Sequence, residues 1–408
     1  MNWRTLIGIV LNFGVNIVAG TNFKIYWNVP SSLCSVKFGI NVTETLISNG
    51  VLVNSKEEFL GDKIVIFYQN KFGKYPYIDG GNDINGGLPE LGNLTEHLRV
   101  SEDDINQIIL NSSFDGLGII DWERWRPTWR FNWANMHVYK ARTLALMRQK
   151  HPDWSWEQVV NASIDWWEET TKQWMLETLE LAKKMRHEGK WCYYHFPDCY
   201  NYAGKNEPDQ FHCSSIVKNE NDRLFWLWNS TTALCPSIYY DPRQGKYNET
   251  QKVWYLYGRL SEATRVSQPK TPIYSYINYR MRNGLNDVPK DHFPLMLSYV
   301  ASLGLDGVVI WGSSEYVKSK KNCEELETYV KEVIAPAATN ITSTASWCGE
   351  TFCNNNGLCT WPQQPYTSWK CLIDPTACSF NPEDIACRCQ VHEGRYCNIT
   401  DSYSTDLL

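Results

Sequence analysis

Short apolar runs recur along the chain, and longer stretches with helical periodicity separate them. Seven of the runs have the length and composition of strands; they begin at residues 23, 63, 114, 191, 236, 271 and 306. Asn93–Leu110 and Ser155–His187 are typical of helices, the second with a broad apolar face. Strands that alternate with helices indicate a parallel sheet. We therefore predict an α/β fold, a TIM-like barrel of seven or eight strands, over residues 21–340.

One run differs from the others because it ends in acids. Phe114–Trp129 reads FDGLGIIDWERWRPTW, so an apolar strand leads directly to Asp121 and Glu123. Strands of a buried parallel sheet are normally apolar throughout, so two carboxylates at the end of one need a reason. Alternate residues of a strand point to the same side, about 6.6 Å apart. Asp121 and Glu123 should therefore face the same mouth of the barrel, with Trp122 pointing away.

Other polar or aromatic side chains also fall at the ends of the predicted strands: Trp27, Tyr68, Tyr194, Tyr239, Tyr276 and Trp311. Barrel enzymes build their active sites at the carboxyl ends of the strands. The repetition from strand to strand predicts one shared cleft around the acid pair.

Composition places the protein outside the cell. Residues 1–20 carry one early cation and an apolar run before Ala19 and Gly20, the pattern of a cleaved secretory signal, with an uncleaved anchor as the alternative. Fourteen Cys, an even number, fit disulfides formed in an oxidising compartment. Eight Asn-x-Ser/Thr sites for glycosylation agree: Asn41, Asn93, Asn111, Asn161, Asn229, Asn248, Asn340 and Asn398. We predict a secreted monomer without a membrane anchor.

The last part of the chain, residues 341–408, has a composition of its own. Eight Cys fall between Cys348 and Cys397, and such a density indicates a small unit stabilised by disulfides. Its closing C-x-C-x7-C pattern resembles the end of an epidermal-growth-factor-like module. That resemblance implies the pairs Cys348–Cys359, Cys353–Cys387 and Cys389–Cys397, and leaves Cys371 and Cys378 to pair with each other.

The acid pair indicates glycosidic bond hydrolysis. Two close carboxylates push their proton affinities apart, so that one can stay protonated near neutrality and act as a general acid. Neighbours on one strand are poorly placed to attack a bond from opposite sides, as a protein nucleophile and an acid must. They suit a mechanism in which the N-acetyl oxygen of the substrate is the nucleophile. Glu123 would then protonate the leaving oxygen, and Asp121 would hold the N-acetyl nitrogen.

The central stretch is similar to the catalytic strand of the hyaluronidases, glycoside hydrolase family 56. The segments FKIYWNVPSSLC, IFYQNKFGKYPY, FPDCYNY, LWNSTTALCPSIYY and DGVVIWGSSE extend the similarity across the chain, most of all to secreted arthropod venom and salivary members. The resemblance implies that Asp121 orients the acetamido group and Glu123 donates the proton. It also implies that Tyr194 lies near that group, that Tyr239 and Trp311 line the cleft, and that Asp198 is close by.

The same resemblance implies the disulfides Cys34–Cys323 and Cys199–Cys213. Cys192 and Cys235 remain; each sits just before a matched Tyr, so they either form a bridge behind the site or stay as buried thiols. Arg126, Arg130, Arg259 and Arg280 are candidates for binding glucuronate carboxylates, since a guanidinium matches a carboxylate. Arg126 could equally brace the acid pair.

Other functions fit the sequence less well. No metal-binding motif or phosphate-binding glycine loop appears, so we expect no cofactor. A net charge of −6 gives no overall attraction to a polyanion, and we expect no nucleic acid partner. Family 18 chitinases also use the substrate as nucleophile, but their strand has an additional Asp where this chain has Gly118-Ile119-Ile120. A chondroitin-preferring hydrolase and a non-catalytic glycosaminoglycan-binding protein are the remaining alternatives; the second normally lacks the acid that Glu123 supplies.

Overall fold

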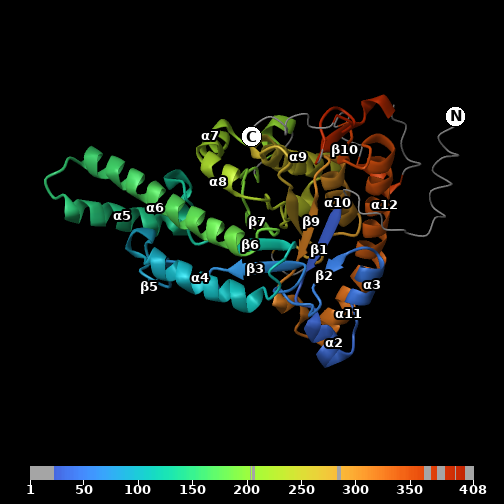
Figure 1. Ribbon diagram of the computed structural model, residues 1–408, viewed down its shortest axis with the longest axis horizontal. Coiled ribbons are helices and arrows are strands. Elements are labelled where there is room, and N and C mark those ends of the chain that lie inside the picture. Colours follow the sequence, from blue (N-terminus) through green and yellow to red (C-terminus); the bar gives the residue numbers. More distant parts are fainter. Residues whose placement is uncertain are drawn as a thin grey trace, which may run out of the picture.

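Two parallel sheets form the centre of the molecule, and helices surround them (Figure 1). The computed structural model describes residues 23–202, 204, 207–282, 286–362, 369–374, 382–390 and 392–399. One sheet has the order β2-β1-β9-β8 and consists of β1 (Lys24–Asn28), β2 (Leu52–Val53), β8 (Tyr274–Asn278) and β9 (Gly307–Trp311). The other has the order β3-β6-β7, from β3 (Ile64–Tyr68), β6 (Leu117–Asp121) and β7 (Lys190–Tyr193). Both sheets are parallel throughout, as the α/β barrel prediction requires.

Residues 234–237 connect the two sheets between β7 and β8. Isolated parallel bridges join Tyr194 to Cys235, Leu234 to Ile273 and Ser237 to Tyr276. The sequence analysis expected a full strand at 236–240, and this expectation was wrong in extent. Pro236 has no N–H to donate, so a regular ladder cannot run through it.

The other junction, between β2 and β3, depends on one side chain. The Asn54 amide accepts from the backbone N–H groups of Lys63 and Ile64 at 2.9 and 3.0 Å, and donates to the Ile64 carbonyl at 2.8 Å. Asn54 is 1% exposed, and the side chain thus replaces a strand-to-strand ladder. Strand β2 was not predicted, because two residues are too few to show an alternation of apolar and polar positions.

Helices cover the outside of the strands. The predicted helix at 93–110 is α4 (Leu94–Ile108), capped by Asn93, and the one at 155–187 is α6 (Trp156–Met185), capped by Ser155. With α5 (His137–Lys150), α6 forms a long hairpin that projects from the body (Figure 1). The others are α2 (Ser32–Phe38), α3 (Thr43–Ser48), α7 (Ser215–Arg223), α8 (Phe225–Ser230), α9 (Glu249–Val266), α10 (His292–Ser302), α11 (Lys320–Tyr329), α12 (Ala335–Phe352) and α13 (Lys370–Ile373). A short hairpin joins β4 (Tyr77–Asp79) to β5 (Asn82–Ile84).

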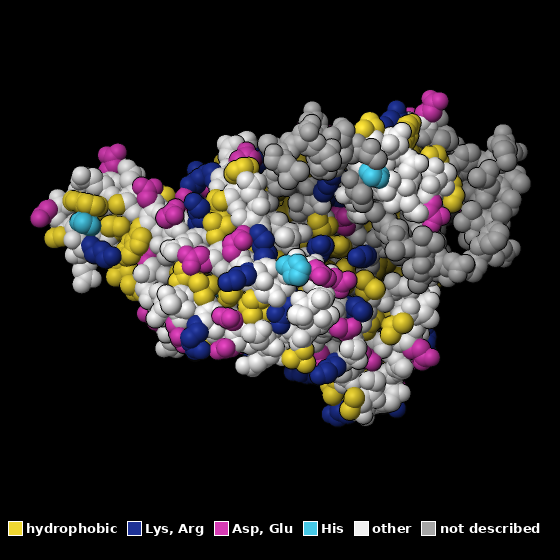
Figure 2. All heavy atoms as spheres, in the orientation of Figure 1, with side chains coloured by type: hydrophobic (Ala, Val, Ile, Leu, Met, Phe, Trp, Pro, Cys, Tyr) yellow, Lys and Arg dark blue, Asp and Glu magenta, His cyan; other side chains and the backbone are white. Residues whose placement is uncertain are grey.

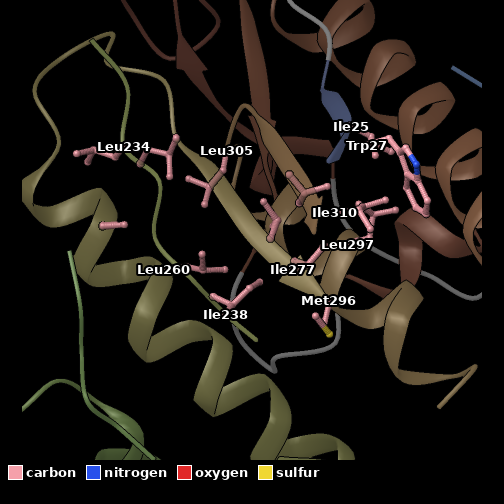
Figure 3. Packing of buried hydrophobic residues seen from close by; sticks show 14 of the residues in the cluster. Ile25, Trp27, Leu234, Ile238, Leu260, Ile277, Met296, Leu297, Leu305 and Ile310 are labelled. Carbon is pink, nitrogen blue, oxygen red and sulfur yellow. The ribbon is translucent and has the colours of Figure 1, made fainter. Parts of the chain in front are cut away.

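Alternate residues of each strand face two different cores. Tyr276 and Val309 point into the barrel, where they form one cluster with the ends of the other strands. Their neighbours Ile277 and Ile310 point outward into a second cluster, which includes residues of α9 and α10 (Figure 3). Leu260, Met296 and Leu297 are the helical partners shown there. Burial on both faces explains why the strands read as continuous apolar runs.

The cysteine-rich segment contains a small antiparallel ladder, β10 (Gly357–Thr360) with β11 (Ala386–Cys389). Disulfides join Cys348 to Cys359, Cys353 to Cys387 and Cys389 to Cys397, as predicted for this segment. Cys378 lies outside the described residues, so its pairing with Cys371 stays a prediction. The expected division at residue 341 falls inside α12, because this helix runs without a break from the barrel into the cysteine-rich segment.

The barrel itself contains three further disulfides: Cys34–Cys323, Cys199–Cys213 and Cys192–Cys235. The last of these resolves the alternative left open for Cys192 and Cys235. All eight Asn residues of the predicted glycosylation sites are exposed. Across the described ranges, no helix is long and apolar enough to cross a membrane.

A buried imidazole on α4 predicts that stability falls in acid. His97 is 0% exposed; its Nδ1 accepts from the Lys74 N–H at 2.8 Å, so its Nε2 donates to the Thr178 hydroxyl at 2.9 Å. Burial lowers the pKa of His97 to about 3, whereas in the unfolded chain it is about 6.5. Between these values the unfolded chain binds the extra proton, so the free energy of unfolding decreases as the pH falls.

We expect this residue alone to reduce the free energy of unfolding by roughly 2 kcal/mol between pH 7 and pH 5. Urea unfolding of the wild type and of His97→Gln at both pH values measures the effect. The variant should be less stable at pH 7, but its loss of stability between the two pH values should be smaller. His187→Gln, at an exposed histidine, is the control. An unchanged pH difference in His97→Gln contradicts the assignment.

Candidate active site

Because of the strand registers, the residues that were predicted at strand ends lie side by side at the carboxyl end of the barrel. Tyr68 pairs with Asp121 across β3 and β6, and Trp311 lies beside Asn28 and Asn278 at the end of β9. A cavity of about 540 Å³ opens at this level. Its lining includes seven residues that the sequence analysis assigned to the cleft: Tyr68, Asp121, Glu123, Tyr194, Tyr239, Tyr276 and Trp311. Trp27 does not line it; this side chain is 1% exposed and stacks on Tyr279.

The two carboxylates share the cavity but differ in their surroundings. Asp121 is the last residue of β6 and only 8% exposed, whereas Glu123 lies just beyond the strand and is exposed. Trp122 points away, as predicted, and packs against Tyr75 with 4.6 Å between ring centroids. The buried indole fixes the backbone between the acids, so both side chains stay on the cavity side.

The surroundings of Asp121 raise its affinity for a proton. Burial and the nearby charge of Glu123 raise the pKa of Asp121 well above its usual range, and Arg126 opposes them. One oxygen of Asp121 is buried without a hydrogen-bond partner. That Glu123 donates the proton to the leaving oxygen stays a prediction.

Aromatic side chains form the walls of the cavity. The Trp311 indole donates to the Tyr68 hydroxyl at 3.0 Å, and its ring stacks on Tyr239 at 6.0 Å. Tyr194 meets Tyr276 edge to face at 4.9 Å. Burial, followed by the negative charges of Glu123 and Asp121, raises the pKa of Tyr194, so its phenol stays neutral and able to donate. Flat rings with polar edges suit the binding of a sugar, which has apolar C–H faces and hydroxyl edges.

Asp198 and Arg259 do not line this cavity, although both were assigned to substrate binding. The Arg259 guanidinium is 2% exposed and donates to the Asp198 carboxylate at 2.8 Å, while His195 contacts the other carboxylate oxygen. Burial would raise the pKa of Asp198, but His195 and Arg259 together lower it far below its usual range. A buried guanidinium that is already paired is not available to a substrate carboxylate. We therefore withdraw both assignments to the substrate: Asp198 and Arg259 form a structural ion pair that does not line the cavity.

Arg126 takes the bracing role that the sequence analysis weighed against carboxylate binding. Its Nη1 donates to the backbone carbonyl of Glu123 at 2.9 Å, and its own backbone N–H donates to Asn132 at 2.8 Å. Arg126 is absent from the described lining of the cavity. The side chain therefore holds the loop that carries Glu123, and the proposed contact with substrate is withdrawn.

The two other arginine candidates differ from each other. Arg280 does line the cavity, but Asp287 and Glu325 already bind its guanidinium at 2.9 and 3.3 Å. Arg130 lies in a separate groove of about 820 Å³ and pairs there with Glu220 at 3.3 Å. Neither arginine is the unpaired cation that was predicted to bind a glucuronate carboxylate.

Several residues of the cavity lining were missed: Gln69, Asn70, Arg124, Asn278, Arg282, Ser313 and Tyr316. Most directly follow strands, so the rule that found Tyr68 and Trp311 would have found them if extended by a few residues. Arg282 lies four residues after the end of β8, so the same extension would have found it. Among the described residues, no cluster of His, Cys, Asp and Glu could hold a metal ion.

A parallel barrel with two carboxylates at the carboxyl end of one strand, under aromatic walls, has the architecture of a glycoside hydrolase. The family model described as hyaluronidase, glycoside hydrolase family 56, matches residues 14–387. The chain is 44% identical to a hyaluronidase of Loxosceles intermedia over 92% of its length and 94% of that protein, and 34% identical to hyaluronidase-1 of Sus scrofa over 90% and 84%. This chain belongs to the hyaluronidase family.

A solved structure agrees with the sequence comparisons. The crystal structure of bee venom hyaluronidase in complex with a hyaluronic acid tetramer superposes with a TM-score of 0.72 at 33% identity. The match covers 78% of this chain and 98% of the bee protein. The TIM-like α/β fold and the assignment as a glycoside hydrolase therefore hold for this chain.

Proposed function

We propose that this chain is a secreted endo-β-N-acetylhexosaminidase that cleaves the β-1,4 bonds of hyaluronan with retention of configuration. The observation that carries the proposal is the pair Asp121 and Glu123 in one aromatic cavity, with a buried Asp121 oxygen that lacks a partner. Relatives named hyaluronidase, and the bee enzyme bound to a hyaluronic acid tetramer, support the choice of substrate.

In the proposed mechanism, Glu123 donates its proton to the glycosidic oxygen as the bond from that oxygen to the anomeric carbon breaks. The acetamido oxygen of the substrate attacks the same carbon, and a cyclic oxazolinium intermediate forms. Asp121 accepts a hydrogen bond from the acetamido N–H and stabilises the positive charge. Tyr194 orients the acetamido group as a donor. Water then opens the ring, and Glu123 recovers its proton, so the product keeps the β configuration.

Burial raises the proton affinity of Asp121, and the proposed mechanism needs the proton on Glu123. Two strongly interacting carboxyls titrate as a unit, so a proton can pass from one to the other. Glu123 is the exposed member and so the one that can reach a leaving oxygen. When the acetamido N–H approaches Asp121, it favours the ionised form of that residue and thereby moves the proton to Glu123.

A protein nucleophile is disfavoured by the lining itself. A retaining enzyme of that kind needs a carboxylate on each side of the bond, about 5 to 5.5 Å apart. Asp121 and Glu123 come from one strand end, and no other carboxylate is found in the described lining of the cavity. The nucleophile must then come from the substrate.

Secretion is part of the proposal. Six disulfides join described cysteines, and such bonds persist in oxidising compartments. The exposure of all eight predicted glycosylation sites supports passage through the secretory pathway.

Digestion of hyaluronan, chondroitin and chitin side by side, with products sized by mass spectrometry, tests the proposed substrate. We expect even-numbered oligosaccharides from hyaluronan and no products from chitin. Faster cleavage of chondroitin would make the chain a chondroitin-preferring member of the family. Binding of hyaluronan without cleavage of any polymer would make it a glycosaminoglycan-binding protein and would contradict the proposal.

The raised pKa of Asp121 predicts how activity depends on pH. The mechanism needs one proton on the pair, and this proton is lost as the pH rises through the raised value. Activity should therefore persist above the usual range of a carboxyl pKa and fall as the pH rises through the raised value. Asp121→Asn should lower kcat/KM by about 100-fold or more, because it removes the charge that stabilises the intermediate.

The pH profile of kcat/KM separates this account from a loss of folding. In Asp121→Asn the remaining carboxyl no longer shares a proton with a buried neighbour, so the alkaline limb should move to lower pH. Asp79→Asn, which removes an exposed acid at the edge of the site, should leave the profile unchanged. An alkaline limb at the same pH in Asp121→Asn would show that another group sets it.

A further inference from the structure

Three arginines line the cavity, and one of them differs from the others in its partners. Arg124 lies 3.2 Å from Asp79, and Arg280 binds both Asp287 and Glu325. No described carboxylate lies within 4 Å of Arg282. In the described part of the lining, Arg282 is thus the arginine without an ion pair to a described carboxylate.

The protein positions this cation beside the catalytic groups. The Arg282 backbone N–H donates to the Tyr240 carbonyl at 3.1 Å, and the preceding side chain, Met281, is buried. Burial lowers the pKa of Arg282, but the neighbouring Tyr194, Tyr202 and Glu123 outweigh it and raise this pKa. A guanidinium that lines the same cavity as Tyr194 and Glu123, without an ion pair to a described carboxylate, presents a localised positive charge to a ligand in that cavity.

The net charge of the chain does not supply this attraction. The chain has a net charge of −6, and in Figure 2 basic and acidic side chains alternate over the visible face without a large patch of one sign. An anionic polymer must therefore be held by charges inside the site. Within the described lining, a substrate carboxylate would gain the most electrostatic attraction near Arg282, whose guanidinium has no ion pair to a described carboxylate.

The chemistry of the polymer gives this position a specific meaning. When a β-1,4 bond between N-acetylglucosamine and glucuronate is cleaved, the leaving oxygen is attached to C4 of the glucuronate. The carboxylate of the same sugar is attached to C5, the next ring atom. A residue that protonates the leaving oxygen is therefore always close to this carboxylate, and a cation beside Glu123 faces it.

We propose that Arg282 binds the carboxylate of the glucuronate that carries the leaving oxygen, and that it thereby selects uronate-containing polysaccharides. The inference rests on the proposed function and deepens it. Arg282 is a specificity-determining residue: it distinguishes a uronate from a neutral sugar on the leaving side, while the acid pair recognises the N-acetyl sugar on the other side. Chitin contains the N-acetyl sugar but no uronate.

Comparison of hyaluronan with carboxyl-methylated hyaluronan, which is uncharged, tests the proposal. A charge-assisted hydrogen bond contributes about 1.5–3 kcal/mol, so Arg282→Gln should lower kcat/KM on hyaluronan about 10- to 150-fold. On the methylated polymer the same change should have less than a threefold effect. Arg282→Lys should recover part of the loss. Arg124→Gln, whose guanidinium is already paired with Asp79, is the matched control and should retain the preference for the charged polymer.

An equal loss on both polymers in Arg282→Gln would overturn the assignment, because it would indicate a structural role. Binding of a hyaluronan hexasaccharide, measured by calorimetry, reports on Arg282 independently of cleavage. If the wild type cleaves neither polymer but Arg282→Gln still weakens binding at least tenfold, the proposed function fails and the carboxylate contact stands. Unchanged binding and unchanged preference would exclude the contact.

Discussion

Replacing Glu123 by glutamine is expected to lower kcat on hyaluronan by about 10²- to 10⁴-fold, the usual contribution of a general acid. The amide has the same shape but cannot donate the proton that the leaving oxygen needs. Glu123 is exposed, and the Arg126 contact is to its backbone carbonyl, so the substitution should leave the fold intact. Single-turnover cleavage of hyaluronan measures the loss, and urea unfolding checks stability.

A matched variant separates chemistry from a general effect of charge. Glu315 follows β9 at the same end of the barrel and is exposed, and Lys318 is its ion-pair partner among the described residues. Glu315→Gln should change kcat less than twofold. Turnover at the wild-type rate in Glu123→Gln would show that the proton comes from elsewhere, and Asp121 would then be the candidate, since it is the other carboxyl in the described lining.

Replacing Arg388 by methionine is expected to destabilise the whole protein by about 3 kcal/mol, although Arg388 belongs to the cysteine-rich segment. Its guanidinium pairs with Asp306, which directly precedes β9 and is 3% exposed. Gln390 and the Ile273 N–H also donate to this carboxylate, at 2.5 and 2.8 Å. Without Arg388, a buried charge at the base of the barrel would be left with neutral partners only.

Urea unfolding followed by tryptophan fluorescence measures this loss. The double variant Asp306→Asn with Arg388→Met should recover part of it, because the neutral amide needs no counter-charge. Arg395→Met, at an arginine with an exposed contact in the same segment, should change stability by less than about 0.5 kcal/mol. If Arg388→Met unfolds at the same urea concentration as the wild type, the segment does not stabilise the barrel through this pair.

The acid pair and its aromatic surroundings were predictable because they depend on local patterns. A strand reads as a short apolar run, and the residue at its carboxyl end lies at the barrel mouth whatever the loops do. Tyr68 and Trp311 were found in this way, and they hydrogen-bond to each other although 243 positions separate them in the chain. This reasoning fails where a proline interrupts the pairing of strands, as at Pro236, which has no backbone N–H to donate.

The partners of charged side chains were not predictable. Asp198 and Arg259 were assigned to the substrate, but each neutralises the other in a buried site. Arg282 was not considered at all, yet it is the arginine of the described lining without an ion pair to a described carboxylate. Whether a cation is free depends on which acids the fold brings within a few ångströms, and a single sequence does not contain that distance. The raised pKa of Asp121 posed the same difficulty, because it depends on burial that a single sequence does not show.

The stereochemistry of the first product tests the central claim most directly, namely that the substrate supplies the nucleophile to the pair Asp121 and Glu123. Proton NMR of a hyaluronan digest, recorded before the sugar mutarotates, gives the anomeric configuration at the new reducing end. The proposed mechanism inverts the anomeric carbon twice and predicts the β anomer. An α anomer formed first would mean a single displacement by water and would contradict the account.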